Sequence, residues 1–276
     1  MTPVVILLVL AAAGLHAGWN VLLKTSGDPL PTATRSLAAS ALLVTPVCLV
    51  AWCATGHPGL PALGWLVLGL SACAEGVYFV SLSRAYQAGD LSVVYPVARG
   101  TGPLVAVAGG LLVLHEHLTA LELTGVLTVL VGIWAVRRPR MNAAVVPALV
   151  TGVFIGLYTT LDRVGINLGS PWLYAGLLWG LMALVLAVWT QGRPLGWTAG
   201  ENWRTSVAIG VMMSLAYGLF LVALTLAPVA IAAPLRESAI VLVTAWGVWH
   251  LKEREGLPLR LGGAVAIVVG ILLIAI

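Results

Sequence analysis

The chain has 276 residues, of which 60% are hydrophobic and 9% charged, and its mean hydropathy is +1.03. A soluble domain carries about a quarter charged residues, so this chain has too few to cover a surface exposed to water. Its formal charge of +4 comes from basic residues in short loops beside apolar runs, which indicates membrane insertion rather than nucleic-acid binding. The runs are long enough for helices rather than barrel strands, so we predict an all-α integral membrane protein.

Ten apolar runs of about 20 residues predict ten transmembrane helices with short connections and no soluble domain. The first run lacks a basic leader and is longer than a signal peptide needs, which favours a membrane helix. Three cysteines in or beside these runs have no metal-ligand spacing and are interpreted as packing residues. The predicted helices cover 3–24, 32–55, 62–87, 91–114, 119–138, 143–165, 171–190, 202–226, 228–250 and 257–276.

The two halves of the sequence repeat each other. Arg99 lies 17 residues before Glu116, and Arg236 lies 17 residues before Glu253. Two further glycine pairs have the GxxxG spacing that allows membrane helices to approach closely. The matching glycines and tyrosines are Gly14 with Gly152, Gly18 with Gly156, Tyr78 with Tyr217, and Gly125 with Gly262.

This duplication predicts two five-helix repeats, residues 1–139 and 140–276. Because five is odd, the second copy should enter the membrane from the opposite side. Such inverted repeats are found in many secondary transporters, which hold their site near the midplane between the copies. Eleven of the fourteen basic residues lie in or beside loops on one side, so that side is predicted to be cytoplasmic and both termini outside.

Charged residues inside membrane helices are costly and predict a functional site. Arg99 and Arg236 each lie about eight residues into their helices, from opposite faces, so both approach the midplane. Tyr95 shares a helix face with Arg99 at a spacing of four residues. The alternative is structural, with the arginines capping carbonyls or pairing with Glu75 or Glu237 to fix helix packing.

Two further positions offer groups for proton exchange. Glu75 shares a helix face with Tyr78, and a carboxyl in an apolar setting can take up and release protons near neutral pH. His16, Trp19 and Asn20 share one face of the first helix, and histidine suits proton coupling. A static ion pair for the glutamate and a packing role for the histidine are the alternatives.

Aromatic residues within the runs are candidates for lining a pocket for an organic substrate, and the alternative is an interfacial belt. These are Tyr78, Tyr95, Tyr158, Tyr217 and Trp246.

The clusters 115–117 and 252–255 are interpreted as solvated helix ends, since three consecutive residues cannot all face one metal ion from a helix. No HExxH, Walker A or GxSxG motif occurs, so we expect no enzyme, no metal and no cofactor.

Three stretches resemble the drug/metabolite transporter superfamily, specifically its ten-helix members made of two EamA domains. They are HAGWNVLLK (16–24), RAYQAGDLSVVYPVARGTGPLVAVAGGLLVLHEHLT (84–119) and ALTLAPVAIAAPLRESAIVLVTAWGVWHLKERE (223–255). The chain is also similar to the four-helix small multidrug resistance proteins, which carry a glutamate eight residues before a lysine in their first helix. Here His16 precedes Lys24 by eight residues, so the resemblance makes His16 a candidate for coupling or substrate contact. The position is not a carboxylate, and Ile155 stands eight residues before Arg163 in the second repeat, so coupling would need His16 or Glu75.

The resemblance and the buried charges together predict a secondary active transporter of a small organic solute, either a metabolite or a drug-like molecule. It would export the solute across the inner membrane by alternating access, with proton coupling as an option. Its expected partners are the solute, the bilayer and protons, without nucleic acid, and it would be a monomer or a weak homodimer. Two converging arginines suit an anionic or zwitterionic substrate better than a cationic drug.

A flippase for a lipid-linked small molecule and a non-transporting membrane scaffold are the alternatives. The candidate substrate-binding residues surround an expected cavity between the first, third, fourth, sixth, eighth and ninth helices. They are His16, Trp19, Asn20, Glu75, Tyr78, Tyr95, Arg99, Tyr158, Tyr217, Arg236 and Glu237.

Overall fold

The computed structural model describes residues 2–89, 91–136, 143–190, 203–238 and 257–275, and the regular elements in these ranges are helices. They are α1 (Pro3–Thr25), α2 (Pro29–Ala54), α3 (Ala62–Ala88), α4 (Leu91–Ala108), the π-helical segment η1 (Gly109–Val113), α5 (Ala120–Val136), α6 (Val145–Gly165), α7 (Pro171–Trp189), α8 (Trp203–Leu226), α9 (Val229–Arg236) and α11 (Leu257–Ala275).

The described helices follow the predicted ranges closely. The largest difference at a helix end is at α2, which begins at residue 29 rather than 32. For the ninth predicted helix only Val229–Arg236 is described, and the rest of that range lies outside the described residues.

Six of the described helices are long and apolar enough to cross a membrane, namely α1, α2, α3, α6, α7 and α8. Three shorter apolar segments lie in α4 with η1, in α5 and in α11. The chain is therefore a multi-pass membrane protein by length and composition. That all ten predicted helices span the bilayer stays a prediction.

Corresponding helices of the two halves begin with the same device. Asp28 accepts a hydrogen bond from the Leu30 amide at 3.3 Å and is followed by Pro29, the first residue of α2. Ser170 accepts one from the Leu173 amide at 3.2 Å, again just before a proline at the start of α7. A short polar side chain followed by proline satisfies one free amide and removes another, which sets the start of a helix.

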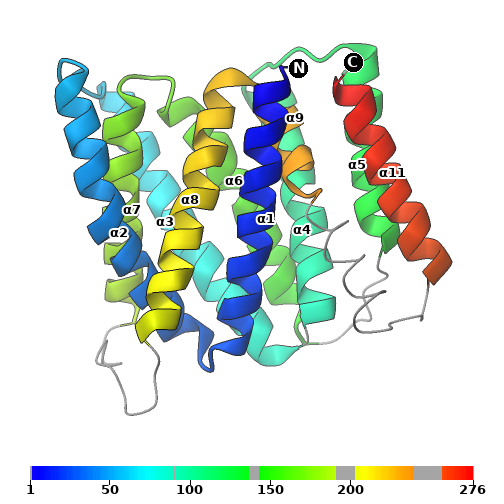
Figure 1. The fold of residues 1–276 in the computed structure, drawn as a ribbon, viewed down its shortest axis with the longest axis horizontal. Coiled ribbons are helices and arrows are strands. Elements are labelled where there is room, and N and C mark those ends of the chain that lie inside the picture. The colour runs from blue at the N-terminus through cyan, green and yellow to red at the C-terminus, as the bar shows by residue number, and fades with distance from the viewer. Residues whose placement is uncertain (1, 90, 137–142, 191–202, 239–256, 276) are drawn as a thin grey trace.

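The helices pack as a pseudo-twofold bundle (Figure 1). The pairs α3–α6 and α1–α8 become each other when the two halves are exchanged, and so do α2–α8 and α3–α7. The pairs α2–α7, α4–α9 and α5–α11 each join corresponding helices. The pairs α2–α7 and α5–α11 form the two edges of the molecule, and α1 begins at the same end of the bundle at which α11 stops.

Small residues bring some of these helices into very close contact. A Cβ atom at Gly125 of α5 would lie 2.7 Å from the carbonyl oxygen of Gly270 in α11. A Cβ at Gly156 would lie 2.7 Å from the amide nitrogen of Ala106, so the second GxxxG pair brings α6 against α4. The first pair differs, because a Cβ at Gly14 would meet no atom of the described residues within 4 Å. The close packing predicted for the glycines therefore holds for the second pair and for Gly18, whose Cβ would meet the Met212 side chain, and is not seen at Gly14 within the described part of the chain.

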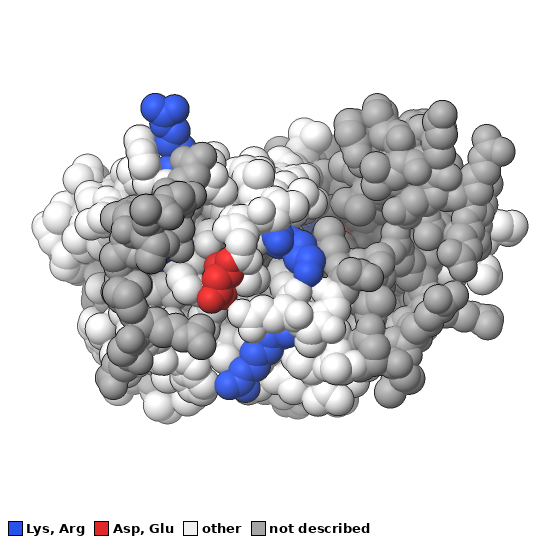
Figure 2. All heavy atoms as spheres, turned by 90° about the horizontal axis from the view of Figure 1, so that it is seen from below, with Lys and Arg blue, Asp and Glu red and all other residues white. Residues whose placement is uncertain are grey.

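The end of the bundle that carries the α1–α2 turn has exposed basic side chains (Figure 2). Arg84 near the end of α3 and Arg204 at the start of α8 are exposed, and Lys24 at the end of α1 is half-buried. This grouping matches the side predicted from loop charges, whose cytoplasmic orientation stays a prediction.

Candidate functional site

The two halves of the bundle are joined by a buried ion pair. Arg99 lies in the middle of α4, and Glu237 directly follows α9. The Arg99 Nη1 atom is 3.1 Å from Glu237 Oε1, and the two side chains are 4% and 2% exposed. A charge-assisted hydrogen bond compensates both charges in this buried position. Removing either partner would leave the other charge buried and uncompensated, which is strongly destabilising.

Arg236 has the same charge and depth but a different setting. Its guanidinium carbon lies 4.0 Å from the centre of the Phe220 ring, and its Nε atom is 3.9 Å from Glu237 Oε1. The Nε and Nη1 atoms have no hydrogen-bond partner among the described residues, and the residue is 3% exposed. The pairing with Glu237 that was considered as the structural alternative is therefore formed closely by Arg99 and only at longer range by Arg236.

A carboxylate that we did not select from the sequence lies deep in the same region. Asp162, near the end of α6, is fully buried. It accepts hydrogen bonds from Ser71 Oγ at 2.5 Å, from Tyr174 Oη at 2.6 Å and from Tyr217 Oη. Four helices, α3, α6, α7 and α8, therefore meet at one side chain. Its spacing of four residues from Tyr158 was the signal that could have identified it.

Glu75 of α3 is buried near this carboxylate. Its Oε1 atom has no hydrogen-bond partner among the described residues. Glu75 lies within electrostatic reach of both Asp162 and Arg236, although no described arginine forms an ion pair with it at 4 Å or less. Within the described chain, the static ion pair considered as an alternative for Glu75 does not form.

The predicted aromatic residues that are described do lie together. The Tyr78 and Tyr158 ring centres are 5.6 Å apart, and those of Tyr158 and Tyr217 are 5.8 Å apart. Tyr217 in turn lies 6.2 Å from Phe220, whose ring carries Arg236. A continuous aromatic row thus runs from α3 across α6 to α8 and ends on the guanidinium. Nothing is described of the Tyr95 side chain, and Trp246 lies outside the described residues.

The three predicted residues of α1 divide into two roles. The Asn20 amide donates to the His16 carbonyl at 2.8 Å and accepts from Tyr86 Oη at 2.9 Å, so it is satisfied within the fold. The ring centres of His16 and Trp19 are 4.7 Å apart, and Trp19 lies 6.3 Å from Phe79. His16 Nε2 has no described partner and lies in the field of both buried arginines.

Glu116 is not the solvated helix end that we predicted. Its carboxylate accepts hydrogen bonds from the amides of Val229 at 2.8 Å and Ala230 at 3.0 Å, which cap the start of α9. It also lies 3.5 Å from Arg163 Nε, and its side chain is 9% exposed. An acidic group at a helix N-terminus satisfies free amides and the positive end of the helix dipole. The sequence could not reveal this role, because the capped helix lies more than a hundred residues away.

Matching basic residues lie at opposite ends of the bundle. Lys24, at the end of α1, donates to the carbonyls of Tyr86 at 2.6 Å and Gly89 at 3.0 Å at the end of α3. Arg163, at the end of α6, donates to the Leu224 carbonyl near the end of α8. Each cation holds the free carbonyls at one helix end, and so each repeat is fastened at its own end.

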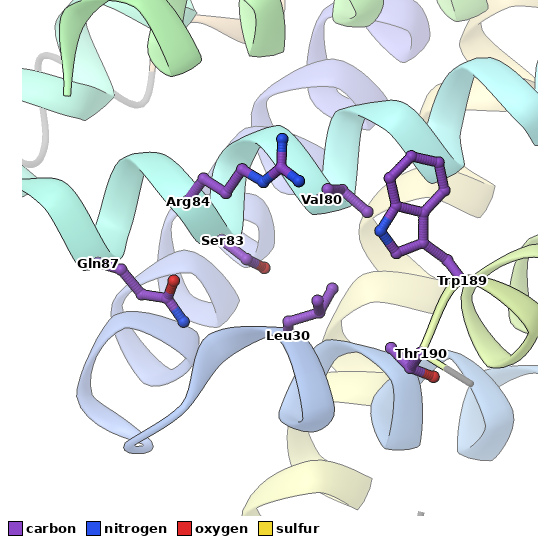
Figure 3. A pocket seen from close by; sticks show the side chains of 7 residues that line it. All are labelled: Leu30, Val80, Ser83, Arg84, Gln87, Trp189 and Thr190. Carbon is purple, nitrogen blue, oxygen red and sulfur yellow. The ribbon is translucent and has the colours of Figure 1, made fainter. Parts of the chain in front are cut away.

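One cavity lies away from this central region, between the start of α2 and the ends of α3 and α7 (Figure 3). Its volume is about 200 Å³, and its lining contains none of the predicted site residues. The six helices expected to surround a central cavity do converge, but His16, Glu75, Arg99, Arg236 and Glu237 are each at most 8% exposed. The candidate groups are therefore closed off from the outside. Within the described residues, no group of three or more potential ligands could hold a metal ion.

A bundle of apolar helices with charges buried between two related halves defines a polytopic membrane protein built from an internal duplication. The model of the EamA-like transporter family matches the sequence twice, over residues 3–138 and 142–276. The chain belongs to this family, and thus to the drug/metabolite transporter superfamily that it resembles. The double match confirms that the chain contains two EamA repeats.

No curated protein sequence matches the chain significantly. A solved structure described only as "Crystal structure of protein" is similar in fold, with a TM-score of 0.71 and 18% sequence identity. The match covers 98% of both chains, so the similarity extends over the whole bundle.

Proposed function

We propose that this protein is a secondary active transporter that moves a small organic solute across the inner membrane, with export as its direction. The carrying observation is the ion pair between Arg99 of the first repeat and Glu237 of the second, buried among apolar helices. Charges in such a place are costly unless they serve a pathway or a binding site. A solute that competes for these groups changes the contacts between the repeats when it binds.

Alternating access follows from the arrangement of the two repeats, taken as residues 1–139 and 140–276 in inverted orientation. The central groups are shared between the repeats, whereas the fastenings at Lys24 and Arg163 lie at opposite ends. Releasing one fastening at a time would open the centre to one side only. The charge-rich end, with Lys24 and Arg84, would face the cytoplasm, and both termini would lie outside.

Proton coupling is the energy source that the buried groups support best. Glu75 and Asp162 lie within electrostatic reach of each other and of Arg236, so protonation of one carboxyl changes the charge that a solute meets. His16 lies in the field of the same arginine. If solute uptake into vesicles is indifferent to a pH gradient, none of these groups carries a coupling proton.

Transport can be tested with Arg99→Lys. This substitution keeps a positive charge opposite Glu237 but loses the planar fork of the guanidinium. Arg204→Lys, at an exposed position on α8, is the matched control. Purified wild-type protein should be stabilised against thermal unfolding by at least one metabolite in a library. Cells that express it should also release that solute into the medium.

We expect Arg99→Lys to fold and to lose both effects, whereas Arg204→Lys keeps them. If no compound stabilises the wild type and no solute is released, the protein is a scaffold rather than a transporter. A stabilising compound with a lipid tail, together with lipid scrambling in vesicles, would instead indicate a flippase.

A further inference from the structure

We propose that Arg236 recognises a carboxylate on the transported solute, whose apolar or aromatic body lies along Phe220, Tyr217 and Tyr158. This inference rests on the proposed transport function and adds the chemical class of the substrate. It gives the two buried arginines different roles, in which Arg99 holds the ion pair that changes on transport and Arg236 contacts the solute.

The first argument is the unmet hydrogen-bonding capacity of Arg236. A guanidinium has five N–H donors in a planar fork that fits the two oxygens of a carboxylate. The Nε and Nη1 atoms of Arg236 have no described hydrogen-bond partner, and the ion-pair contact of Nε with Glu237 is long at 3.9 Å, although the residue is only 3% exposed. Buried donors are nearly always satisfied, so donors that stand open in this way indicate a group that is present in another state.

The second argument is the local charge. Glu237 is 3.1 Å from Arg99 and 3.9 Å from the Nε of Arg236, so one carboxylate faces two guanidiniums. Arg99, Arg236 and Glu237 together carry a charge of +1, which a monoanion neutralises when the nearby Glu75 and Asp162 carboxyls are protonated. A dianion such as a phosphate monoester would bring excess negative charge close to Glu237 and to Glu75 and Asp162, which lie in the field of Arg236.

The third argument is the surface beside the cation. Phe220 lies under the guanidinium at 4.0 Å, and the Tyr217 and Tyr158 rings continue from it in edge-to-face or tilted contacts. Aromatic faces and edges of this kind bind flat apolar groups well. A solute with a carboxylate at one end and an apolar body would therefore match the polarity of the row. Because the row is buried here, the solute reaches it only when the repeats separate.

The test uses pairs of compounds that differ only in the carboxylate. Suitable pairs are butyrate and butyramide, 3-phenylpropionate and 3-phenylpropionamide, and indole-3-acetate and indole-3-acetamide. Binding to the full-length protein in lipid nanodiscs is measured by isothermal titration calorimetry, with phenethylamine and inorganic phosphate as further probes. The variants are Arg236→Met, Arg236→Lys and the control Arg204→Lys.

The wild type should bind at least one aromatic carboxylate about tenfold to 100-fold more tightly than its amide, as one charge-assisted bidentate contact provides. Arg236→Met should bind acid and amide equally. Arg236→Lys should retain part of the preference, because a point charge remains without the fork. Arg204→Lys should behave as the wild type.

The inference is wrong if the wild type binds no carboxylate of the set, binds the amides equally well, or keeps its preference in Arg236→Met. Tighter binding of phenethylamine or phosphate would also overturn it. Transport measured as released solute distinguishes the two proposals. If solute is released but carboxylates are not preferred, the transport proposal stands and the carboxylate proposal is wrong. If neither is observed, both proposals are wrong.

Discussion

Arg99 and Arg236 occupy corresponding positions in the two repeats, yet the groups that surround them differ. Both arginines are buried among apolar helices, 137 residues apart in the sequence. Arg99 has a carboxylate at 3.1 Å, whereas Arg236 has an aromatic ring at 4.0 Å and two donors without a described hydrogen-bond partner. The duplicated cation is therefore satisfied in one repeat and open in the other.

The reason for the difference lies at the next residue. Glu237 follows Arg236, and Gly100 follows Arg99. A Cβ atom at Gly100 would lie 2.9 Å from Trp134 of α5, so the first repeat has no room for a second carboxylate. The single glutamate crosses to the arginine of the other repeat, and this leaves Arg236 with donors that have no described hydrogen-bond partner. An internal duplication can thus produce a site that is symmetric in fold and asymmetric in charge.

The largest expected effect on stability comes from breaking the ion pair between Arg99 and Glu237. Arg99→Leu leaves Glu237 buried without its close partner, and loss of one member of a buried pair costs about 3–5 kcal/mol. We expect the free energy of unfolding, measured by SDS titration in mixed micelles, to fall by about this amount. The double variant Arg99→Leu with Glu237→Leu should recover most of the loss, because it removes both charges together. A double variant no more stable than Arg99→Leu would show that the pair does not act as a unit.

The second effect concerns Asp162, which stands in the second repeat alone. Asp162→Asn keeps the shape but replaces a carboxylate by an amide that cannot accept from all three hydroxyls. A hydrogen bond to a charged group contributes about 1.5–3 kcal/mol, so we expect a loss of about 2–3 kcal/mol. Tyr174→Phe should cost less, since only one donor is removed and two remain. The same SDS titration measures both, and equal costs would contradict the shared role of Asp162.

The helices and the duplication were accessible from the sequence because they rest on local patterns. Apolar runs of sufficient length, ended by Pro, Gly and charge, placed the helix ends close to those observed, and matching residues placed the two repeats. The burial of Arg99 and Arg236 followed from their positions in these runs. That Tyr78, Tyr158 and Tyr217 lie together was also foreseen.

The sequence left open which carboxylate pairs with which arginine. Glu237 follows Arg236 in the chain, which suggested that it neutralises its neighbour, but adjacent residues on a helix point in different directions. Its contact with Arg99 depends on how α4 meets α9. Asp162 was missed because it stands near a predicted helix end, and Glu116 because an acidic residue beside histidines looks solvated. Each of these carboxylates takes its role from a distant helix.

A smaller effect on stability is expected at the end of the bundle where Glu116 meets Arg163 and the start of α9. Glu116→Gln removes the ion pair with Arg163 and the negative charge at the start of α9 but keeps an oxygen that can accept. Charge at a helix N-terminus contributes about 0.5–1 kcal/mol, so a loss of about 1 kcal/mol in the SDS titration is expected. If the contact keeps this end of the bundle closed, a cysteine introduced near Arg163 should react faster with a thiol reagent in Glu116→Gln than in the wild-type background. Unchanged labelling would show that the contact only caps α9.

The smallest effect on stability should come from Arg236 itself. Arg236→Met keeps a long side chain over Phe220 and removes a buried charge whose donors lack described partners. The lost stacking, worth about 2 kcal/mol when desolvated, is offset by the removed cost of burying an unsatisfied cation. The free energy of unfolding should therefore stay within about 1 kcal/mol of the wild type, while solute release is lost. A cost as large as that of Arg99→Leu would make the two arginines equivalent and would place Arg236 in the packing of the fold. A near-zero cost with lost transport would separate them, since a charge kept at no benefit to stability must serve the ligand.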